Sequence, residues 1–390
     1  MFLTSLKVKK KLKKFILSLM AITVVMLSLT FNSCKPEDSV VEPQGIAGSI
    51  GAGQTENLVA GTDYILDGPL IVEDGGVLNI AAGTVIKANK GFSNYILVLQ
   101  GGKINVNGTA ENPVRMTANA TTATSGYWGG LIINGKAPLA GGSTGSTEVN
   151  SAYTYGGTVA ADNSGTIKYL IIEYPGARSS ADVEHNGLTL NGVGSGTVIE
   201  NIYVLESADD AIEFFGGSVN VKNFLAVNPD DDMFDFTQGY NGTLTTAYGV
   251  WAKGYTSTES DPRGIEADGN FDGNFPTQTG QSNFVVNNMT IDLRLDFNTD
   301  KTTQMQDAIK IRRGAKATIT NAIIKGTGSV ADLVDLTDSK GAGDPTSGVS
   351  LTSQLTTAPT REVSGVGVVT VGGNNTGADK AVFGWTKYAF

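Results

Sequence analysis

Carboxylates recur at a fixed spacing in the middle of this sequence. Residues 209–214 (DDAIEF) align with residues 231–236 (DDMFDF) at an offset of 22 residues, and the same offset relates Asn201 to Asn223. Segments 265–268 (IEAD) and 307–311 (DAIKI) fit the same pattern at larger offsets. A repeat of this kind predicts that the equivalent side chains lie side by side in the folded chain.

The alternation within each repeat predicts which side chains face outward. Residues two apart along a strand share a face, so Ile212, Phe214, Phe234 and Phe236 should fill a core. Glu213 and Asp235 should then point outward, in register with Glu266 and Lys310. Neighbouring strands lie about 4.8 Å apart, and like charges at that distance are destabilising. Compensation is expected from a cation, a raised pKa, or a basic neighbour: Lys310, Arg312 or Arg313.

Three roles for these acids remain open. Oxygen clusters suit Ca²⁺, which takes 6–8 oxygen ligands, and the candidate ligands are Asp209, Asp210, Asp231 and Asp232. Paired carboxylates also serve as general acid and base on sugars, and the catalytic candidates are Asp209, Asp210, Glu213, Asp231, Asp232 and Asp235. In a calcium-dependent lyase, Arg312, or in its place Lys310 or Arg313, would fill the basic role if it lay beside the acids. Alternatively, aspartates at strand starts bond to backbone N–H groups and form turns.

A ligand-binding surface is the non-catalytic version of the same hypothesis. Its candidate residues are Glu213, Asp235, Glu266, Lys310 and Trp128. Trp128 is included because exposed aromatic rings stack on sugars, with core packing as the alternative. We expect His185 at the surface or in a turn.

Composition restricts the fold and the partners. The chain has 390 residues, of which 50 are glycine, against a usual share of about 7%. Six lysines lie in the first 14 residues; without them 22 basic residues face 38 acidic ones. Nucleic acid is therefore excluded as a partner, because phosphate binding needs clustered Lys and Arg. One cysteine and one histidine leave no basis for a disulfide framework or a thiolate metal site.

The periodicity predicts an all-β solenoid. Alternation over 4–6 residues, punctuated by pairs such as Gly75-Gly76 and Gly216-Gly217, indicates short strands. A fixed period of roughly 22–30 residues is typical of a stack of coils. We predict a right-handed, single-stranded parallel β-helix of about 11–14 coils over residues 59–390, with loop insertions near 270–280 and 335–362. Asparagines 201, 223, 288 and 321 should stack at bends, and Trp385 should close the C-terminal end.

Segments 70–80 (LIVEDGGVLNI), 82–87 (AGTVIK), 107–114 (NGTAENPV) and 127–133 (YWGGLII) resemble the opening coils of right-handed parallel β-helix proteins. Together they resemble Bacteroidota surface lipoproteins of the pectin-lyase-like superfamily. That superfamily holds lyases, hydrolases, esterases, adhesins and non-enzymes, so the resemblance implies the fold more than an activity. The adjacent aspartates look like those of polygalacturonase-type hydrolases, but the accompanying His-Gly is missing, since Asn186 follows His185.

The N-terminus is typical of an export signal. Basic residues 7–14 precede an apolar run, Phe15–Phe31, and then Asn32, Ser33 and Cys34. Residues 31–34 resemble the loose lipobox of Bacteroidota, which implies a signal peptide over 1–33 and a lipidated Cys34. Residues 34–58 should form the lipidated tether, and residues 35–38 (KPED) resemble a signal for sorting to the outer-membrane surface.

These observations favour a lipid-anchored protein of the outer-membrane surface. The leading expectation is binding of an extracellular glycan or other nutrient polymer, with a possible Ca²⁺ site and an outer-membrane transporter as a possible partner. A polysaccharide lyase or hydrolase that uses the acidic residues is the second hypothesis. A structural adhesin or envelope subunit is the third.

Overall fold

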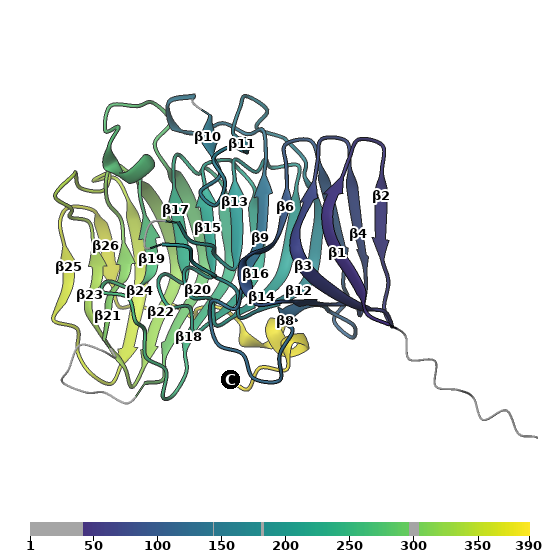
Figure 1. Ribbon diagram of the computed structural model, residues 1–390. Coiled ribbons are helices and arrows are strands. Elements are labelled where there is room, and N and C mark those ends of the chain that lie inside the picture. The colour runs from purple at the N-terminus through teal and green to yellow at the C-terminus, as the bar shows by residue number, and fades with distance from the viewer. Residues whose placement is uncertain (1–41, 143, 181–182, 296–303) are drawn as a thin grey trace, which may run out of the picture. The chain divides into compact units, whose positions relative to one another are not determined.

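The fold is a right-handed parallel β-helix (Figure 1). The computed structural model describes residues 42–142, 144–180, 183–295 and 304–390. In these ranges every strand pairing is parallel except that of the hairpin β10 (Gly145–Ser146) and β11 (Thr154–Tyr155). The predicted fold class is therefore confirmed, whereas residues 1–33 and Cys34 lie outside the described residues. No helix in the described part of the chain has the length and apolar character to cross a membrane.

The strands stack in three columns, each with eleven rungs in the described residues, at the low end of the 11–14 coils predicted. Column 1 contains β2 (Thr55–Leu58), β4 (Val77–Ala81), β7 (Lys103–Asn107), the first parts of β12 (Gly165–Glu173), β14 (Val198–Leu205), β16 (Asn220–Val227), β18 (Thr243–Trp251), β20 (Asn283–Leu293), β22 (Lys316–Gly326) and β24 (Gly348–Leu355), and β26 (Val368–Val371). Column 2 contains the first parts of β1 (Gln44–Ile50) and β3 (Asp63–Val72), then β5 (Val85–Ala88) and β8 (Val114–Ala118), and the second parts of β12 to β24. Column 3 contains the ends of β1 and β3, then β6 (Gly91–Val98), β9 (Trp128–Asn134), β13 (Leu188–Asn191), β15 (Ile212–Phe215), β17 (Phe234–Thr237), β19 (Arg263–Ala267), β21 (Gln304–Lys310), β23 (Ser329–Asp335) and β25 (Arg361–Ser364).

Single left-handed residues bend the long strands between columns 1 and 2. Asn201, Asn223, Asn288 and Asn321 have φ values of 61°, 58°, 58° and 54°, a region that asparagine tolerates better than most residues. Their amides form ladders: Nδ2 of Asn223 donates to Oδ1 of Asn201 at 2.9 Å, and Nδ2 of Asn321 to Oδ1 of Asn288 at 2.7 Å. The prediction that these asparagines stack at bends is confirmed.

The core runs along the inside of the stack. Phe214, Phe236 and Phe284 lie on one another with ring centroids 5.0 and 4.1 Å apart and nearly parallel planes. All three are fully buried, as are Ile212 and Phe234. The inward positions predicted from the alternation are therefore confirmed, and column 3 presents its remaining side chains to the outside.

Two predicted boundaries are wrong. Residues 44–58 are not a tether, because β1 and β2 form the first rungs of the stack. Ile46 and Ile50 lie four residues apart, so they share one face of the strand, and both are buried. The five other residues of β1 are exposed, which left too few apolar positions to indicate a strand. The expected insertion at 335–362 is also incorrect, because β24 and the start of β25 lie inside it. The expected loop at 270–280 is found, around the short 3₁₀ turn η2 (Phe271–Gly273).

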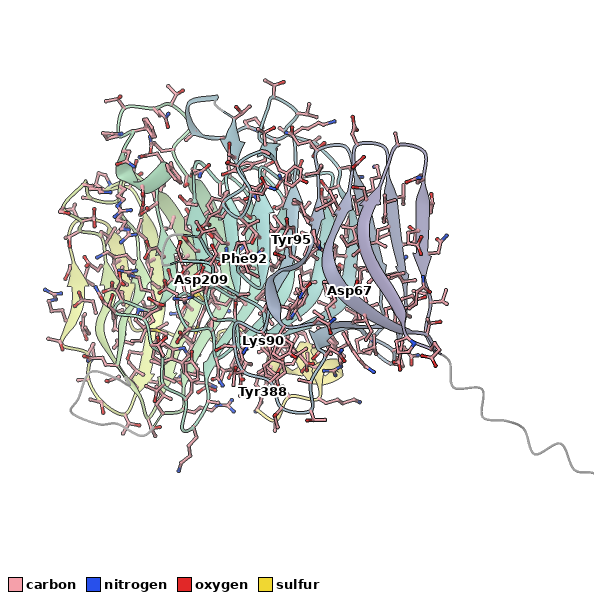
Figure 2. The ribbon with its side chains drawn as sticks, in the orientation of Figure 1. Asp67, Lys90, Phe92, Tyr95, Asp209 and Tyr388 are labelled. Carbon is pink, nitrogen blue, oxygen red and sulfur yellow. The ribbon has the colours of Figure 1, made fainter. Side chains whose placement is uncertain are left out.

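Trp385 does not close the C-terminal end. The chain after β26 turns back, and η4 (Lys380–Thr386) packs on the outer face of column 2, with Tyr388 beside it (Figures 1 and 2). Trp385 meets Tyr169 edge-on at 5.3 Å. Column 2 has apolar side chains on its outer face, including Ile171, Leu225 and Tyr248, and burying them is favourable, which explains why the aromatic tail covers this face.

Candidate functional site

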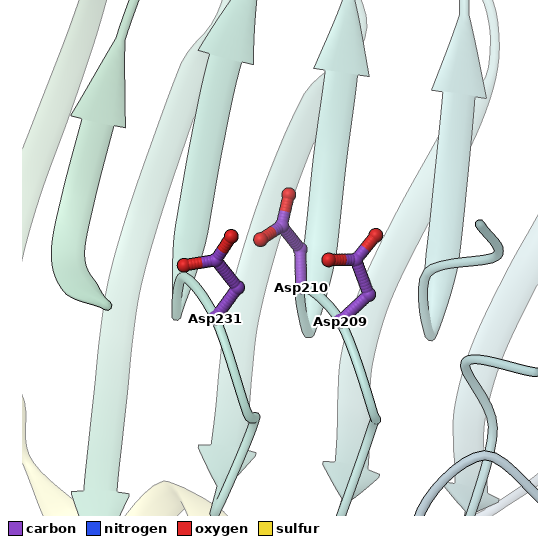
Figure 3. Close-up of side chains that lie close together, drawn as sticks. All are labelled: Asp209, Asp210 and Asp231. Atoms are coloured by element: carbon purple, nitrogen blue, oxygen red, sulfur yellow. The ribbon is translucent and has the colours of Figure 1, made fainter. Parts of the chain in front are cut away.

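The repeated acids meet at the start of neighbouring rungs of column 3. Figure 3 shows Asp209 and Asp210 before β15 beside Asp231 before β17. Glu213 pairs in register with Asp235, and Asp235 with Glu266, as predicted. Carboxylate oxygens of Asp209, Asp210 and Asp231 lie within 4.8 Å of one another, and so do those of Asp210, Glu213 and Asp235. We call these side chains the acidic cluster: Asp209, Asp210, Glu213, Asp231, Asp232 and Asp235.

Two of these acids also join successive coils. Oδ1 of Asp210 accepts the backbone N–H of Asp232 at 2.9 Å, and Oδ1 of Asp232 accepts that of Arg263 at 2.7 Å. Asn186 begins the series by accepting the N–H of Asp210 at 3.3 Å. The turn hypothesis thus accounts for one oxygen of Asp210 and one of Asp232. It does not account for Asp209, Asp231, Glu213 or Asp235.

Burial and mutual repulsion favour the protonated forms of the side chains in the acidic cluster. Desolvation, followed by the charge of neighbouring acids, raises the pKa of Asp209, Asp210 and Glu213 well above the usual range. Burial raises the pKa of Asp231 to about 7 and that of Asp235 to about 6. Oδ1 of Asp231 and Oδ1 of Asp235 are buried without a hydrogen-bond partner among the described residues. Such oxygens are costly and suit a bound cation or proton.

The next rungs of column 3 carry acids that are paired. We call this region the ion-pair ladder: Arg263, Glu266, Asp268, Asp307, Lys310, Arg312, Arg313, Asp332, Asp335 and Arg361. Arg263 contacts Glu266 and Asp307, the latter at 3.2 Å. Lys310 Nζ lies 2.5 Å from Asp335. Arg361 donates two hydrogen bonds to the carboxylate of Asp332, of 2.6 and 2.5 Å.

Three of the residues predicted from the sequence to bind a ligand or take part in catalysis belong to the ion-pair ladder: Glu266, Lys310 and Arg312. Arg312 contacts Glu266 and lies 2.7 Å from Asp268. Burial and the neighbouring Arg263 and Arg313 lower the pKa of Arg312 to about 10. Glu266 and Lys310 are buried and engaged with these partners. Arg312 therefore lies beside acidic side chains, as predicted for a basic neighbour. Among the described residues it forms ion pairs with Glu266 and Asp268.

A groove lies over column 3, next to the acidic cluster. It consists of two adjoining cavities of about 360 and 510 Å³ that share Ser146, Tyr155, Gln238 and Phe271 in their walls. Glu213 lines the first cavity together with Glu148, Glu184 and Asn186. Phe275 lines the second. Of the site residues predicted from the sequence, Glu213 alone lines the groove.

Two chain segments from distant coils form its walls. The first consists of residues 139–142 and 144–156, where Asn134 donates to Thr147 Oγ1 at 2.6 Å. The second is residues 270–280, where the N–H of Phe275 donates to Asn270 at 2.9 Å. The segments meet where the N–H of Gly141 donates to the carbonyl of Thr279 at 2.8 Å. Sequence reasoning identified 270–280 as a loop but missed residues 139–156, whose Gly, Ser and Thr content was the available signal.

Trp128 and His185 do not lie where the sequence suggested. Trp128 is fully buried and its indole N–H donates to the carbonyl of Glu173 at 2.8 Å, so its inclusion in a ligand-binding surface is wrong. His185 is buried against Phe92 and Tyr95, which Figure 2 labels on β6. Burial lowers the pKa of His185 to about 4, so the imidazole is neutral near pH 7 and is not a surface group.

Comparison with known proteins addresses the family. A family model described as a pectate-lyase like beta helix domain matches residues 51–381. The match covers nearly all of the three columns and both segments that wall the groove. The searches of curated proteins and of solved structures find no match.

Proposed function

This chain belongs to the family of pectate-lyase-like β-helix domains, and from that membership we propose that it binds an extracellular glycan. Membership of this family indicates a carbohydrate-related role. The groove over column 3 is the site that we assign to the glycan. The chain would do this as a lipoprotein of the outer-membrane surface, anchored through Cys34.

The observation that carries the proposal is the shape and lining of the groove. Its two cavities adjoin, which suits an extended chain of sugars better than a single small molecule. Phe271 and Phe275 at its rim are 51% and 46% exposed, whereas large apolar side chains are normally covered. Tyr155 and Gln238, joined by a bond of 3.0 Å, and Asn186 supply polar groups for sugar hydroxyls. An aromatic rim above polar side chains is a combination typical of ligand sites.

Binding to the groove can be tested with the full-length protein and a panel of soluble glycans. Phe271→Ala and Phe275→Ala should each weaken binding about tenfold, corresponding to about 1.4 kcal/mol. Val366→Ala is the matched control, since Val366 is equally apolar and 71% exposed but lies between β25 and β26 at the end of the stack. Equal affinities for all four proteins would show that any glycan bound elsewhere.

We also propose Ca²⁺ in the acidic cluster. Asp209, Asp210 and Asp231 offer oxygens within 4.8 Å of one another, and an oxygen-only donor set is what Ca²⁺ prefers. The buried Oδ1 atoms of Asp231 and Asp235 have no hydrogen-bond partner among the described residues, which supports a bound cation at this place. Asp232 contributes less, because it belongs to none of the groups whose carboxylate oxygens lie within 4.8 Å of one another. The bound ion would supply positive charge to the stacked carboxylates.

A glycoside hydrolase is the second candidate function. It is favoured by Glu213, which lines the groove and whose pKa is raised by burial and by Asp235, as a general acid requires. A hydrolase would release new reducing ends, and a calcium-dependent lyase that used Arg312 would release unsaturated products. Incubation with neutral, acidic and amino glycans, followed by detection of both product types, decides whether either activity exists.

The proposed anchor has its own test. Cys34→Ala should abolish labelling by palmitate and association with the membrane fraction. A variant that is still labelled would exclude Cys34 as the lipid site. Co-purification of an outer-membrane transporter with the wild type, and its loss with Cys34→Ala, would support the proposed partner.

A further inference from the structure

The two cavities of the groove differ in the charge of their walls. Four acidic residues, Glu148, Glu184, Glu213 and Asp272, line the first cavity. Among the described residues, the second cavity, of about 510 Å³, is lined by no acidic or basic side chain. Taking a charged group out of water without a partner is costly. The part of a ligand that occupies the second cavity should therefore be uncharged.

One wall of the second cavity is apolar and well packed. Leu139 and Tyr155 line this cavity and form a small apolar cluster with Phe215 of β15. Their exposed fractions are 5% and 2%, so the neighbouring residues hold both side chains in place. A methyl group of a ligand placed against this wall would leave water, which is favourable.

A fixed hydrogen-bond donor lies where the two cavities meet. Gln238 lines both cavities and is 8% exposed. Its Oε1 accepts a hydrogen bond from the hydroxyl of Tyr155 at 3.0 Å. Its backbone carbonyl accepts the N–H of Ala140 at 2.9 Å. Burial raises the pKa of Tyr155 above its usual range, so this hydroxyl keeps its proton and continues to donate to Oε1.

The nitrogen of the same side-chain amide is uncommitted. Nε2 of Gln238 makes no hydrogen bond in the described part of the chain and is not among the side-chain atoms buried without a partner, so it is accessible from the cavities. An amide nitrogen only donates, and it therefore favours an acceptor on the ligand. Gln278 brings a second side-chain amide to the wall of the second cavity.

An acetyl group combines the features that this cavity favours. Its carbonyl oxygen accepts a hydrogen bond, its methyl group is apolar, and it carries no charge. The hydroxyl of an unsubstituted sugar would also accept from Gln238, but it would bring no apolar surface to Leu139. A carboxylate would accept as well, but it would bring a charge to a wall that has no counterion.

We propose that the second cavity binds an acetyl group of an acetylated polysaccharide, with the carbonyl oxygen on Nε2 of Gln238 and the methyl group against Leu139. This inference rests on the proposed glycan-binding function and narrows its ligand class. N-acetylated amino sugars and acetate esters of sugars both present this group. The sugar ring that carries it would lie on Phe271 or Phe275 at the rim.

The test is calorimetry on the full-length protein with two pairs of soluble oligomers. In the first pair, the hexamers of β-1,4-linked N-acetylglucosamine and of β-1,4-linked glucose differ only in the acetamido group. In the second pair, O-acetylated xylohexaose is compared with the same oligomer after removal of its ester groups. Oligogalacturonate in EDTA is the charged comparison.

The acetylated member of at least one pair should bind about tenfold more tightly than its counterpart, because it gains a buried methyl group and a hydrogen bond to a carbonyl. A preference in the first pair alone identifies an amide-linked acetyl group. A preference in the second pair alone identifies an ester-linked one. Oligogalacturonate should bind less tightly than the preferred acetylated oligomer.

Variants locate the preference, expressed as the ratio of the two affinities within a pair. Gln238→Met removes the donor with little change in size and should lower the ratio about tenfold. Leu139→Ala removes the contact with the methyl group and should lower it about fivefold. Gln354→Met is the matched control and should keep the wild-type ratio, since Gln354 is exposed on β24 and lines neither cavity. Melting curves show whether each variant is folded, and if Gln238→Met does not fold, Leu139→Ala still decides.

The outcomes separate the two proposals. The acetyl inference is overturned, while glycan binding stands, if neither acetylated oligomer is preferred, if oligogalacturonate binds best, or if Gln238→Met and Leu139→Ala both keep the wild-type ratio. Any other glycan that binds is tested again after deacetylation, and an unchanged affinity overturns the inference in the same way. If no soluble glycan binds, the proposed function fails and the inference with it.

Discussion

The acidic cluster and the ion-pair ladder occupy the same face of column 3, one after the other, yet their chemistry differs. In the ladder, Arg263, Lys310 and Arg361 alternate with aspartates of neighbouring rungs at 3.2 Å or less. In the acidic cluster, the rungs of β15 and β17 each contribute three carboxylates and no cation. The ladder shows that an outward acid in this fold can be paired when the next coil carries a basic residue beside it. Stacking without such pairing costs stability, and a ligand that brings positive charge would offset the cost.

The largest expected effect is the loss of Arg263 from the ladder. Arg263 is 4% exposed, and Arg263→Ala would leave Asp307 and Glu266 buried without this partner. Breaking a buried pair by removing one partner costs about 3–5 kcal/mol, and we expect that loss in the free energy of unfolding measured with urea. Lys87→Ala breaks the exposed pair with Asp63 and should cost about 1 kcal/mol or less. Similar losses for both variants would contradict the role given to the ladder.

Calcium should act on the acidic cluster and not on the ladder. At a Ca²⁺ concentration of 100 times Kd, a single site stabilises the fold by about 2.7 kcal/mol, which thermal unfolding with Ca²⁺ and with EDTA detects. Asp209→Asn with Asp231→Asn should abolish this stabilisation. Asp332→Asn in the ladder should be less stable in both solutions but keep the same difference between them. A calcium effect that survived the first pair of changes would rule out the site proposed here.

The pH dependence of stability should carry the signature of the acidic cluster. An acid with a raised pKa binds more protons in the folded than in the unfolded chain, so the free energy of unfolding falls as pH rises through the interval between the two values. The pKa is about 7 for Asp231 and about 6 for Asp235 in the folded chain, and about 4 for an ordinary aspartate. The interval therefore lies between about pH 4 and 7. His185, whose pKa is lowered, acts in the opposite direction but is a single group.

We therefore expect the free energy of unfolding to fall by several kcal/mol between pH 4.5 and 7.5 in EDTA, measured by urea unfolding at several pH values. Asp235→Asn with Asp231→Asn should make the profile less steep, while the remaining acids with raised pKa values keep part of the slope. A stability that rose through this range in EDTA would contradict the raised pKa values.

The smallest expected effect comes from giving the acidic cluster a cation of its own. Glu213→Lys would place an amine between Thr189 and Asp235, its neighbours in register, and should stabilise the chain by about 0.5–1 kcal/mol in EDTA. The same change at Glu266, which already contacts Arg263 and Arg312, should destabilise it. Melting temperatures of the two variants test this, and the same sign for both would show that the two regions do not differ as described.

Much of the fold was predictable from particular residues. The period between Asp210 and Asp232 and the alternation around Phe214 reflect local chain geometry, so they gave the register of column 3 and its core. Asparagines at bends followed from their tolerance of positive φ. The tether prediction was wrong because β1 buries only Ile46 and Ile50 of its seven residues, too few apolar positions to indicate a strand. The prediction for Trp385 was wrong because the alternation did not reveal the apolar outer face of column 2.

The candidate site was predictable only in part. Glu213 was found because it belongs to the repeat, whereas Glu148, Tyr155 and Phe271 lie in segments that interrupt it. The position of these segments over column 3 depends on contacts such as Gly141 with Thr279, which no local pattern encodes.

By itself the sequence determined a stack of parallel strands with a row of outward acids, because strand periodicity and turn chemistry act over a few residues and repeat from coil to coil. Only the tertiary structure decided which acids find a cation and which do not, and where a groove opens. Those outcomes depend on side chains brought together from distant positions, such as Arg263 with Asp307, 44 residues apart, and on two loops that meet across several coils.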